Sequence, residues 1–113
     1  MENHSHPKTK WHHYVWAFLA GICLINTLPH FINGIIGNNF PSAFADPPGE
    51  GLSSPEYNIL WAMINFILGY LFLHLGKVTK SQNKFLKIIF ITGCWVMAFF
   101  LAYYFGDIMS KYQ

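Results

Sequence analysis

The feature that most limits how this chain can fold is a set of three long apolar runs. Residues 14–37, 57–76 and 85–105 are each at least twenty residues long and carry few charges. An α-helix rises about 1.5 Å per residue, so a run of this length crosses the roughly 30 Å hydrocarbon core of a bilayer. The third run also lacks the polar stripe that an amphipathic helix of a soluble protein shows. The runs predict an all-α membrane protein with three transmembrane helices.

The composition favours lipid rather than water as the main surroundings of the chain. Charged residues make up 11% of the sequence and hydrophobic residues 53%, whereas an ordinary soluble domain has about 25% charged residues. A net charge of +2 gives no basis for nucleic-acid binding. Cys23 and Cys94 lie in apolar runs, without the spacing of a zinc or redox motif, and are expected to be buried hydrophobes. No metal site and no cofactor is predicted.

Lysines fall mainly on one side of the predicted spans. Six of the seven lie before the first span or between the second and third, whereas the 38–56 loop has none and carries three acidic residues. Lysines are enriched in cytoplasmic loops, so the N-terminus is expected in the cytoplasm and the C-terminus outside. The chain then forms one membrane domain, 1–113, made of a cytoplasmic tail (1–12), TM1 (14–37), an outer loop (38–56), TM2 (57–76), a cytoplasmic loop (77–84), TM3 (85–105) and an outer tail (106–113).

The connections carry further expectations. Four prolines and several apolar side chains in the 38–56 loop favour an ordered cap over the bundle, with a slack linker as the alternative. Ser53 and Glu56 have the spacing of a capping box that would start the second helix. The 77–84 connection is short, so the second and third spans are expected to be antiparallel neighbours. His4, His6, His12 and His13 are interpreted as part of a flexible N-terminal tail.

Polar and small residues in the first two spans recur at helical spacing, so each set should occupy one face. Asn26 and Asn65 both lie near the middle of their spans. An amide facing lipid would lack a partner, so these two are expected to face each other. Small residues on the same faces would let the helices approach closely. The polar residues are Asn26, His30 and Asn33 in the first span and Asn58 and Asn65 in the second, and the expected helix contacts are Gly34, Gly37, Gly69 and Gly76.

Pro29 and His30 mark the place where function is expected. Proline cannot donate a backbone hydrogen bond and its ring presses on the preceding turn, so Pro29 predicts a helix break. An ionisable residue at membrane depth is a functional-site hypothesis by default, and Glu56 is the first-choice partner of His30. Such a pair could relay protons, hold a cation or orient a polar ligand. The alternative is a structural histidine that fixes the outer loop to the bundle.

Three functions fit these residues. The first is a non-enzymatic membrane protein that acts as a homo-oligomer or as a subunit of a larger membrane complex, with the lipid bilayer, its own copies or another membrane protein as partners. The second is a channel or transporter component for a proton, cation or small polar solute. The third is a lipid- or quinone-directed enzyme with His30 and Glu56 as its catalytic pair. Whether the chain is an enzyme stays open, with a non-enzymatic role favoured. The candidate ligand or ion path consists of Asn26, His30, Asn33, Glu56, Asn58 and Asn65.

The stretch from Asn26 to about Tyr70 has a distinctive spacing of polar, proline and glycine residues. They are Pro29-His30-Phe31, Asn33-Gly34, Gly37, Phe40-Pro41, Phe44-Ala45, Pro47-Pro48-Gly49, Gly51-Leu52-Ser53-Ser54-Pro55, Asn58, Trp61 and Asn65. In this pattern, which covers about 45 of the 113 residues, the chain resembles a group of small, uncharacterised bacterial integral membrane proteins. The resemblance implies a multi-pass protein of the bacterial cytoplasmic (inner) membrane and brings no activity with it.

Overall fold

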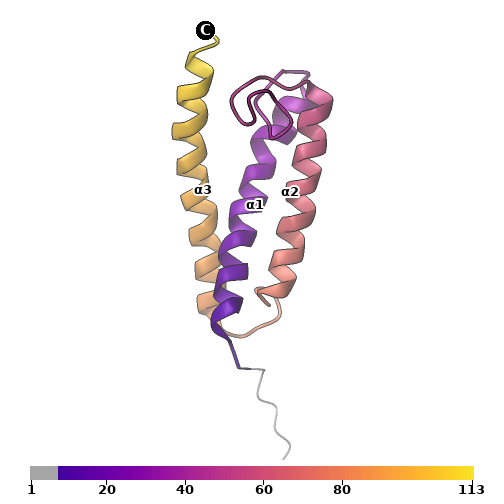
Figure 1. Cartoon of the computed structure of the whole chain (residues 1–113). Coiled ribbons are helices and arrows are strands. Elements are labelled where there is room, and N and C mark those ends of the chain that lie inside the picture. Colours follow the sequence, from indigo (N-terminus) through magenta and orange to yellow (C-terminus); the bar gives the residue numbers. More distant parts are fainter. Residues whose placement is uncertain (1–7) are drawn as a thin grey trace, which may run out of the picture.

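The computed structural model describes residues 8–113 and is built from three long α-helices (Figure 1). They are α1 (Trp11–Ile35), α2 (Pro55–Leu75) and α3 (Lys84–Ser110). Each helix is long and apolar enough to cross a membrane. The only extended pairing within residues 8–113 is an isolated antiparallel bridge between Phe40 and Ser53. The prediction of an all-α protein with three candidate spans is confirmed.

α1 lies between α2 and α3, and no Cα atom of α2 lies within 8 Å of a Cα atom of α3 in the part of the chain that the structure describes (Figure 1). The expectation that the second and third spans are neighbours is therefore wrong. The short connection between them passes the start of α1 instead. Asn83 at its end donates from Nδ2 to the hydroxyl oxygens of Thr9 (3.1 Å) and Tyr14 (2.9 Å). These bonds place α3 against the opposite side of α1 from α2.

Glycines set the distance between α1 and α3. A Cβ atom on Gly21 would collide with the backbone of Phe90 and Cys94, and one on Gly93 would collide with the backbone of Phe18. Helices without side chains at the crossing point can approach until their backbones touch, which is a common way for membrane helices to pack. This contact was not predicted, since the third span was expected to pack on the second and no glycine in it was named as a helix contact.

The contact between α1 and α2 also uses glycine. Gly34 packs on the first turn of α2, Gly69 packs on Leu24, and Gly76 packs on the backbone of the first turns of α1. These three positions are helix contacts, as expected. Gly37 is not: it follows the end of α1 with a φ of +79°, and a Cβ atom added there would meet no other atom within 4 Å. Its role is the left-handed turn that leads into the loop, where glycine avoids the steric cost of a side chain.

Pro29 does not break the first span. It lies inside α1, which continues to Ile35. Asn33 donates from Nδ2 to the Pro29 carbonyl oxygen (2.8 Å), and Gly34 holds the same turn against α2. A proline removes one backbone hydrogen bond, and a membrane helix tolerates this loss where side chains and a packed neighbour support the next turn.

The helix ends differ from the predicted ones in ways that the contacts explain. α1 begins at Trp11, so His12 and His13 are helical rather than part of a tail, while His4 and His6 lie outside the described residues. Ser54 caps α2 by accepting from the N–H of Tyr57 (3.3 Å), because the predicted cap, Ser53, pairs with Phe40 instead.

α3 continues through most of the segment predicted as an outer tail and ends at Ser110. The extra turns are held at the end of the bundle where the 36–54 connection folds, which we call the loop end. Just beyond the helix, the Tyr112 hydroxyl donates to the carbonyl oxygen of Glu50 in that loop (2.7 Å). The opposite end, where residues 76–83 connect α2 to α3, is called the lysine end.

Candidate functional site

His30 lies at the loop end, where all three helices and the connecting loop meet. Its side chain is only 2% exposed. Three aromatic rings surround it edge-on, with ring centroids 5.6 to 6.4 Å from the imidazole. They come from the loop (Phe40), α2 (Trp61) and α3 (Phe105). The imidazole is therefore packed as a core residue on most of its surface.

Asn58 connects His30 to the loop. It is fully buried, and its Oδ1 lies 2.9 Å from His30 Nδ1. Its Nδ2 donates to three backbone carbonyl oxygens around the start of α2. These carbonyls belong to Phe40 (2.8 Å), Ser54 (3.1 Å) and Ser53 (3.3 Å).

The expected partner of His30, Glu56, does not contact it. The Glu56 side chain is exposed, and Asn58 occupies the place that the carboxylate was expected to fill. Successive helical residues are turned by about 100°, so a residue two positions later on α2 faces nearly the opposite way. The prediction of a His30–Glu56 pair is wrong, because Asn58 lies on the face of α2 that packs on α1 and Glu56 does not.

The hydrogen bonds of Asn58 determine which nitrogen of His30 carries hydrogen. Carbonyl oxygens can only accept, so the three contacts fix Nδ2 of Asn58 as the donor side of its amide. The Oδ1 that faces His30 must accept, and His30 Nδ1–H therefore donates. In the neutral imidazole the remaining nitrogen, Nε2, then carries a lone pair and is an acceptor.

His30 Nε2 has no hydrogen-bond partner among residues 8–113. In the described part of the chain, every fully buried side-chain polar atom has a hydrogen-bond partner. Since Nε2 has none, it is not fully buried and keeps some solvent-accessible surface. His30 lines a pocket of about 320 Å³ beneath the loop, with walls from the loop, α1, Trp61 of α2 and α3. The lining is mostly apolar, and we infer that Nε2 meets this space.

Asn26 lines the same pocket one turn before His30. Its Nδ2 donates to Asn65 Oδ1 (3.1 Å), and Asn65 in turn donates to the carbonyl oxygen of Trp61 (2.9 Å). The two mid-span amides therefore face each other as predicted. Asn26 Oδ1 has no partner among the described residues, and we infer that it also meets the pocket, so that Asn26 Oδ1 and His30 Nε2 both offer an acceptor.

The loop is attached to the bundle above this pocket. Ser42 Oγ lies 2.6 Å from Ser53 Oγ, and the Ser42 carbonyl oxygen accepts from the N–H of Gly49 (2.8 Å). The Tyr104 hydroxyl of α3 donates to the carbonyl oxygen of Gly49 (2.9 Å). One loop is thus hydrogen-bonded to itself and to α3, and Asn58 holds it to α2.

The structure brings together four of the six candidate site residues: Asn26, His30, Asn58 and Asn65. It leaves out Asn33, which bonds to its own helix, and Glu56. The aromatic and loop side chains were not predicted as site residues, although apolar side chains of the loop were expected to form a cap over the bundle. Phe40 and Trp61 had a usable signal, because each is a large apolar residue next to the predicted polar face. Phe105 and Tyr104 had none, since α3 was expected to pack on α2.

The fold and this pocket define a small three-helix protein with membrane-length helices and an open, mostly apolar pocket beside the loop at one end. In comparisons with known proteins, no family model, no curated protein and no solved structure matches the chain. A proposal for the function therefore rests on the chemistry of the site.

Proposed function

We propose that this chain is a non-enzymatic protein of the bacterial cytoplasmic membrane that binds a small, mainly apolar molecule in the pocket beneath the loop. The observation that carries the proposal is His30 Nε2, an acceptor held in a fixed direction by Asn58 and left without a partner among the described residues. The lysine distribution supports an N-terminus in the cytoplasm, with the loop and pocket on the outer side.

The ligand that fits must offer a hydrogen-bond donor. His30 Nε2 and Asn26 Oδ1 both accept, and the remaining lining is mostly apolar. A volume of about 320 Å³ is at the lower end of the range for small-molecule pockets. A hydroxylated ring or short amphiphile, such as the head of a quinol, has the required donor and apolar surface.

Binding rather than catalysis follows from the partner of His30. Acid–base histidines are commonly oriented by a carboxylate, which stabilises the imidazolium that forms during the reaction. Here the partner is a neutral amide, and no carboxylate lies among the described residues that line the pocket. The site therefore lacks the second group that the predicted catalytic pair required.

A transport path through a single chain has no support in the packing. On the lysine side of Asn26, α1 meets α3 backbone to backbone at Gly21 and Gly93, and it meets α2 at Gly76. Ala17 and Ala20 are fully buried in the same region. Side chains there leave no polar route that continues from the pocket within residues 8–113, so a channel would need several copies of the chain.

The test compares two ligands that differ only in their donors. Duroquinol has two hydroxyl groups, whereas duroquinone has only carbonyl acceptors. We expect the purified full-length protein in nanodiscs to bind duroquinol about tenfold more tightly by anaerobic calorimetry, since one net hydrogen bond is worth roughly 0.5–1.5 kcal/mol.

The matched variant is His30→Asn. Its shorter amide can still donate to Asn58 Oδ1 but offers no acceptor at the position of Nε2. We expect the preference for duroquinol to disappear, and the unfolding midpoint to fall because the smaller side chain leaves a cavity among the aromatic rings. Ligands are therefore compared at a temperature at which both proteins are folded. Equal binding of the two ligands to the unmodified protein, or an undiminished preference in His30→Asn, would reject the proposed function.

A second candidate, assembly with further copies or with another membrane protein, is favoured by one surface. Trp95, Phe99 and Tyr103 form an exposed aromatic row on α3, with exposed fractions of 61%, 70% and 83%. Aromatic side chains are enriched at protein interfaces. Native mass spectrometry in mild detergent should then show a multiple of the 13.0 kDa chain mass that decreases in Phe99→Ala. A strictly monomeric particle would exclude the homo-oligomer.

A further inference from the structure

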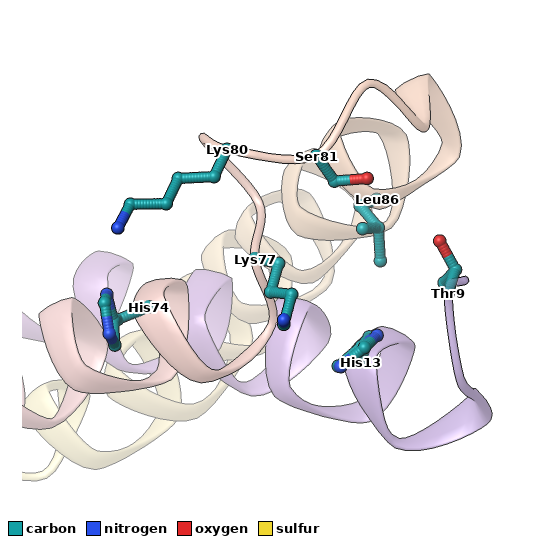
Figure 2. Close-up of a pocket in the computed structure, with 7 residues that line it drawn as sticks. All are labelled: Thr9, His13, His74, Lys77, Lys80, Ser81 and Leu86. Carbon is teal, nitrogen blue, oxygen red and sulfur yellow. The ribbon is translucent and has the colours of Figure 1, made fainter. Parts of the chain in front are cut away.

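A second pocket, of about 330 Å³, lies at the lysine end of the bundle (Figure 2). It is formed by the start of α1, the end of α2, the connection that follows it and the first turns of α3. Its lining consists of two lysines, two histidines, two hydroxyl residues and one leucine. The proposed function makes no use of this pocket, and the sequence predicted no site residue there.

His13 presents a donor to this pocket. The backbone N–H of Lys10 donates to His13 Nδ1 (3.0 Å), so Nδ1 is an acceptor and the hydrogen of the neutral imidazole must reside on Nε2. His13 is only 6% exposed, and Nε2 has no partner among residues 8–113. An N–H without an acceptor in the described part of the chain is thus available at the pocket.

The two hydroxyl groups are also left with a hydrogen to donate. Thr9 Oγ1 accepts from Asn83 Nδ2 (3.1 Å), and Ser81 Oγ accepts from the backbone N–H of Asn83 (3.0 Å). A hydroxyl group has one hydrogen, and neither group donates it to another described residue. Figure 2 shows both hydroxyl groups directed toward the space between Thr9 and Ser81.

The lysines bring positive charge that no described carboxylate neutralises. Lys77 lies in the middle of the pocket in the view of Figure 2, with Lys80 and His74 to one side. The ammonium groups of Lys77 and Lys80 have no hydrogen-bond acceptor among residues 8–113. The acidic residues of that part of the chain lie in the loop, at the start of α2 or near the end of α3, all at the loop end: Asp46, Glu50, Glu56 and Asp107.

Lys77 occupies a backbone position where glycine is usual. Its φ is +53°, in the left-handed region. It follows the helix cap Gly76, and the N–H groups of Lys77 and Val78 bond back to the carbonyl oxygens of His74 (3.1 Å) and Leu73 (3.2 Å). This is the Schellman arrangement, in which the left-handed residue is most often glycine. A strained non-glycine residue beside a pocket is a recognised sign of a functional position.

From these observations we propose that the pocket at the lysine end binds a negatively charged phosphate group. At neutral pH the free oxygens of a phosphate group are hydrogen-bond acceptors, and at most one of them carries an ionisable hydrogen. Such a group suits a pocket that offers N–H, O–H and ammonium donors. The phosphate can belong to an anionic lipid headgroup or to a soluble phosphate ester. Basic pockets between membrane helices at the cytoplasmic side are typical binding places for anionic headgroups.

The experiment has two arms, both on the full chain in a neutral detergent. Native mass spectrometry measures retained phosphatidylglycerol against zwitterionic phosphatidylcholine. Thermal unfolding, followed by circular dichroism, measures the midpoint shift with inorganic phosphate against chloride at equal ionic strength. Preferential retention of phosphatidylglycerol assigns the site to a lipid, and a midpoint shift with phosphate alone assigns it to a soluble ester.

Lys77→Gly is the informative variant, because glycine keeps the left-handed backbone and removes only the charged side chain. Lys111→Ala, at the other end of the bundle, removes one charge outside the pocket. We expect Lys77→Gly to weaken binding about fivefold or more, because one lysine near a membrane surface changes the affinity for anionic lipid by about this factor. We expect Lys111→Ala to leave the affinity unchanged. Lys80→Ala is the second variant if Lys77→Gly does not fold. No binding of either phosphate source, or equal binding by the pocket variants and Lys111→Ala, overturns the proposal.

Discussion

The two ends of the bundle use the same residue type to opposite effect. At the loop end, Asn58 directs its Nδ2 at backbone carbonyls and turns Oδ1 to His30, which leaves the far side of the imidazole as an acceptor. At the lysine end, Asn83 directs its Nδ2 at the hydroxyl oxygens of Thr9 and Tyr14. Hydroxyl groups that accept can still donate. At each end, one asparagine amide thus contributes to whether the neighbouring pocket suits a donor or an acceptor.

The ends also differ in how much the amide matters for stability. Asn58 is fully buried, so water cannot replace it, whereas Asn83 is only partly buried. Unsatisfied buried polar groups cost roughly 1–3 kcal/mol each, and a partly buried group recovers part of that from water. The loop end should therefore depend on its asparagine much more than the lysine end does.

The largest expected effect is that of Asn58→Ala. It leaves the His30 Nδ1–H without an acceptor and removes one hydrogen bond to each of three backbone carbonyls, so we expect a loss of about 3 kcal/mol in unfolding free energy. The carbonyls of Phe40, Ser53 and Ser54 each keep a backbone N–H donor. Asn83→Ala removes the N-cap of α3 and two bonds to hydroxyl oxygens, all at partly buried or exposed sites, and should cost about 1–2 kcal/mol. The measurement is unfolding by denaturing detergent, followed by circular dichroism. Equal losses for the two variants would break the comparison between the ends.

The next effect concerns the contact that separates the two ends. Gly21→Ala places a methyl group against the backbone of α3, and we expect a loss of about 1–3 kcal/mol in the same assay, in the range of overpacking substitutions. Gly106→Ala is the control on α3, because a Cβ there has no atom within 4 Å. A cost for Gly106→Ala as large as that for Gly21→Ala would show that close helix approach is not the cause.

The smallest expected effect has the opposite sign. Lys77→Gly relieves a left-handed lysine, and we expect it to raise the unfolding free energy by roughly 1 kcal/mol in phosphate-free, lipid-free detergent. Added anionic lipid should reverse the order, since only the unmodified protein gains from binding. If Lys77→Gly is less stable than the unmodified protein when both are measured without lipid, the lysine side chain stabilises the turn. The left-handed conformation of Lys77 would then not be a source of strain.

The parts that could be predicted from sequence are those set by local periodicity. Hydropathy identified the three helices, and a spacing of three and four brought Asn26 opposite Asn65. The partner of His30 could not be found this way, because a choice between positions 56 and 58 requires the rotation of α2 about its own axis. The cap at Ser54 rather than Ser53 shows that even the start of that helix was displaced by one residue.

The order of the helices in space could not be predicted from the sequence, for a different reason. A short connection limits the distance between the ends of two helices, but it does not exclude a third helix from lying between them along their length. The signal that existed was the pair Gly21 and Gly93, each a small residue within an apolar run. The pocket at the lysine end was equally hidden, since the left-handed conformation falls on Lys77 although Gly76 stands next to it.

The position of α1 between its two partners has a consequence for biosynthesis. Residues 11–75 can form the α1–α2 hairpin and the loop above it before α3 has been made. The pocket beside His30 takes one wall from α3, through residues such as Leu101 and Tyr104. The bond between His30 and Asn58 therefore needs no residue of α3, whereas the pocket beside it is complete only once α3 has docked.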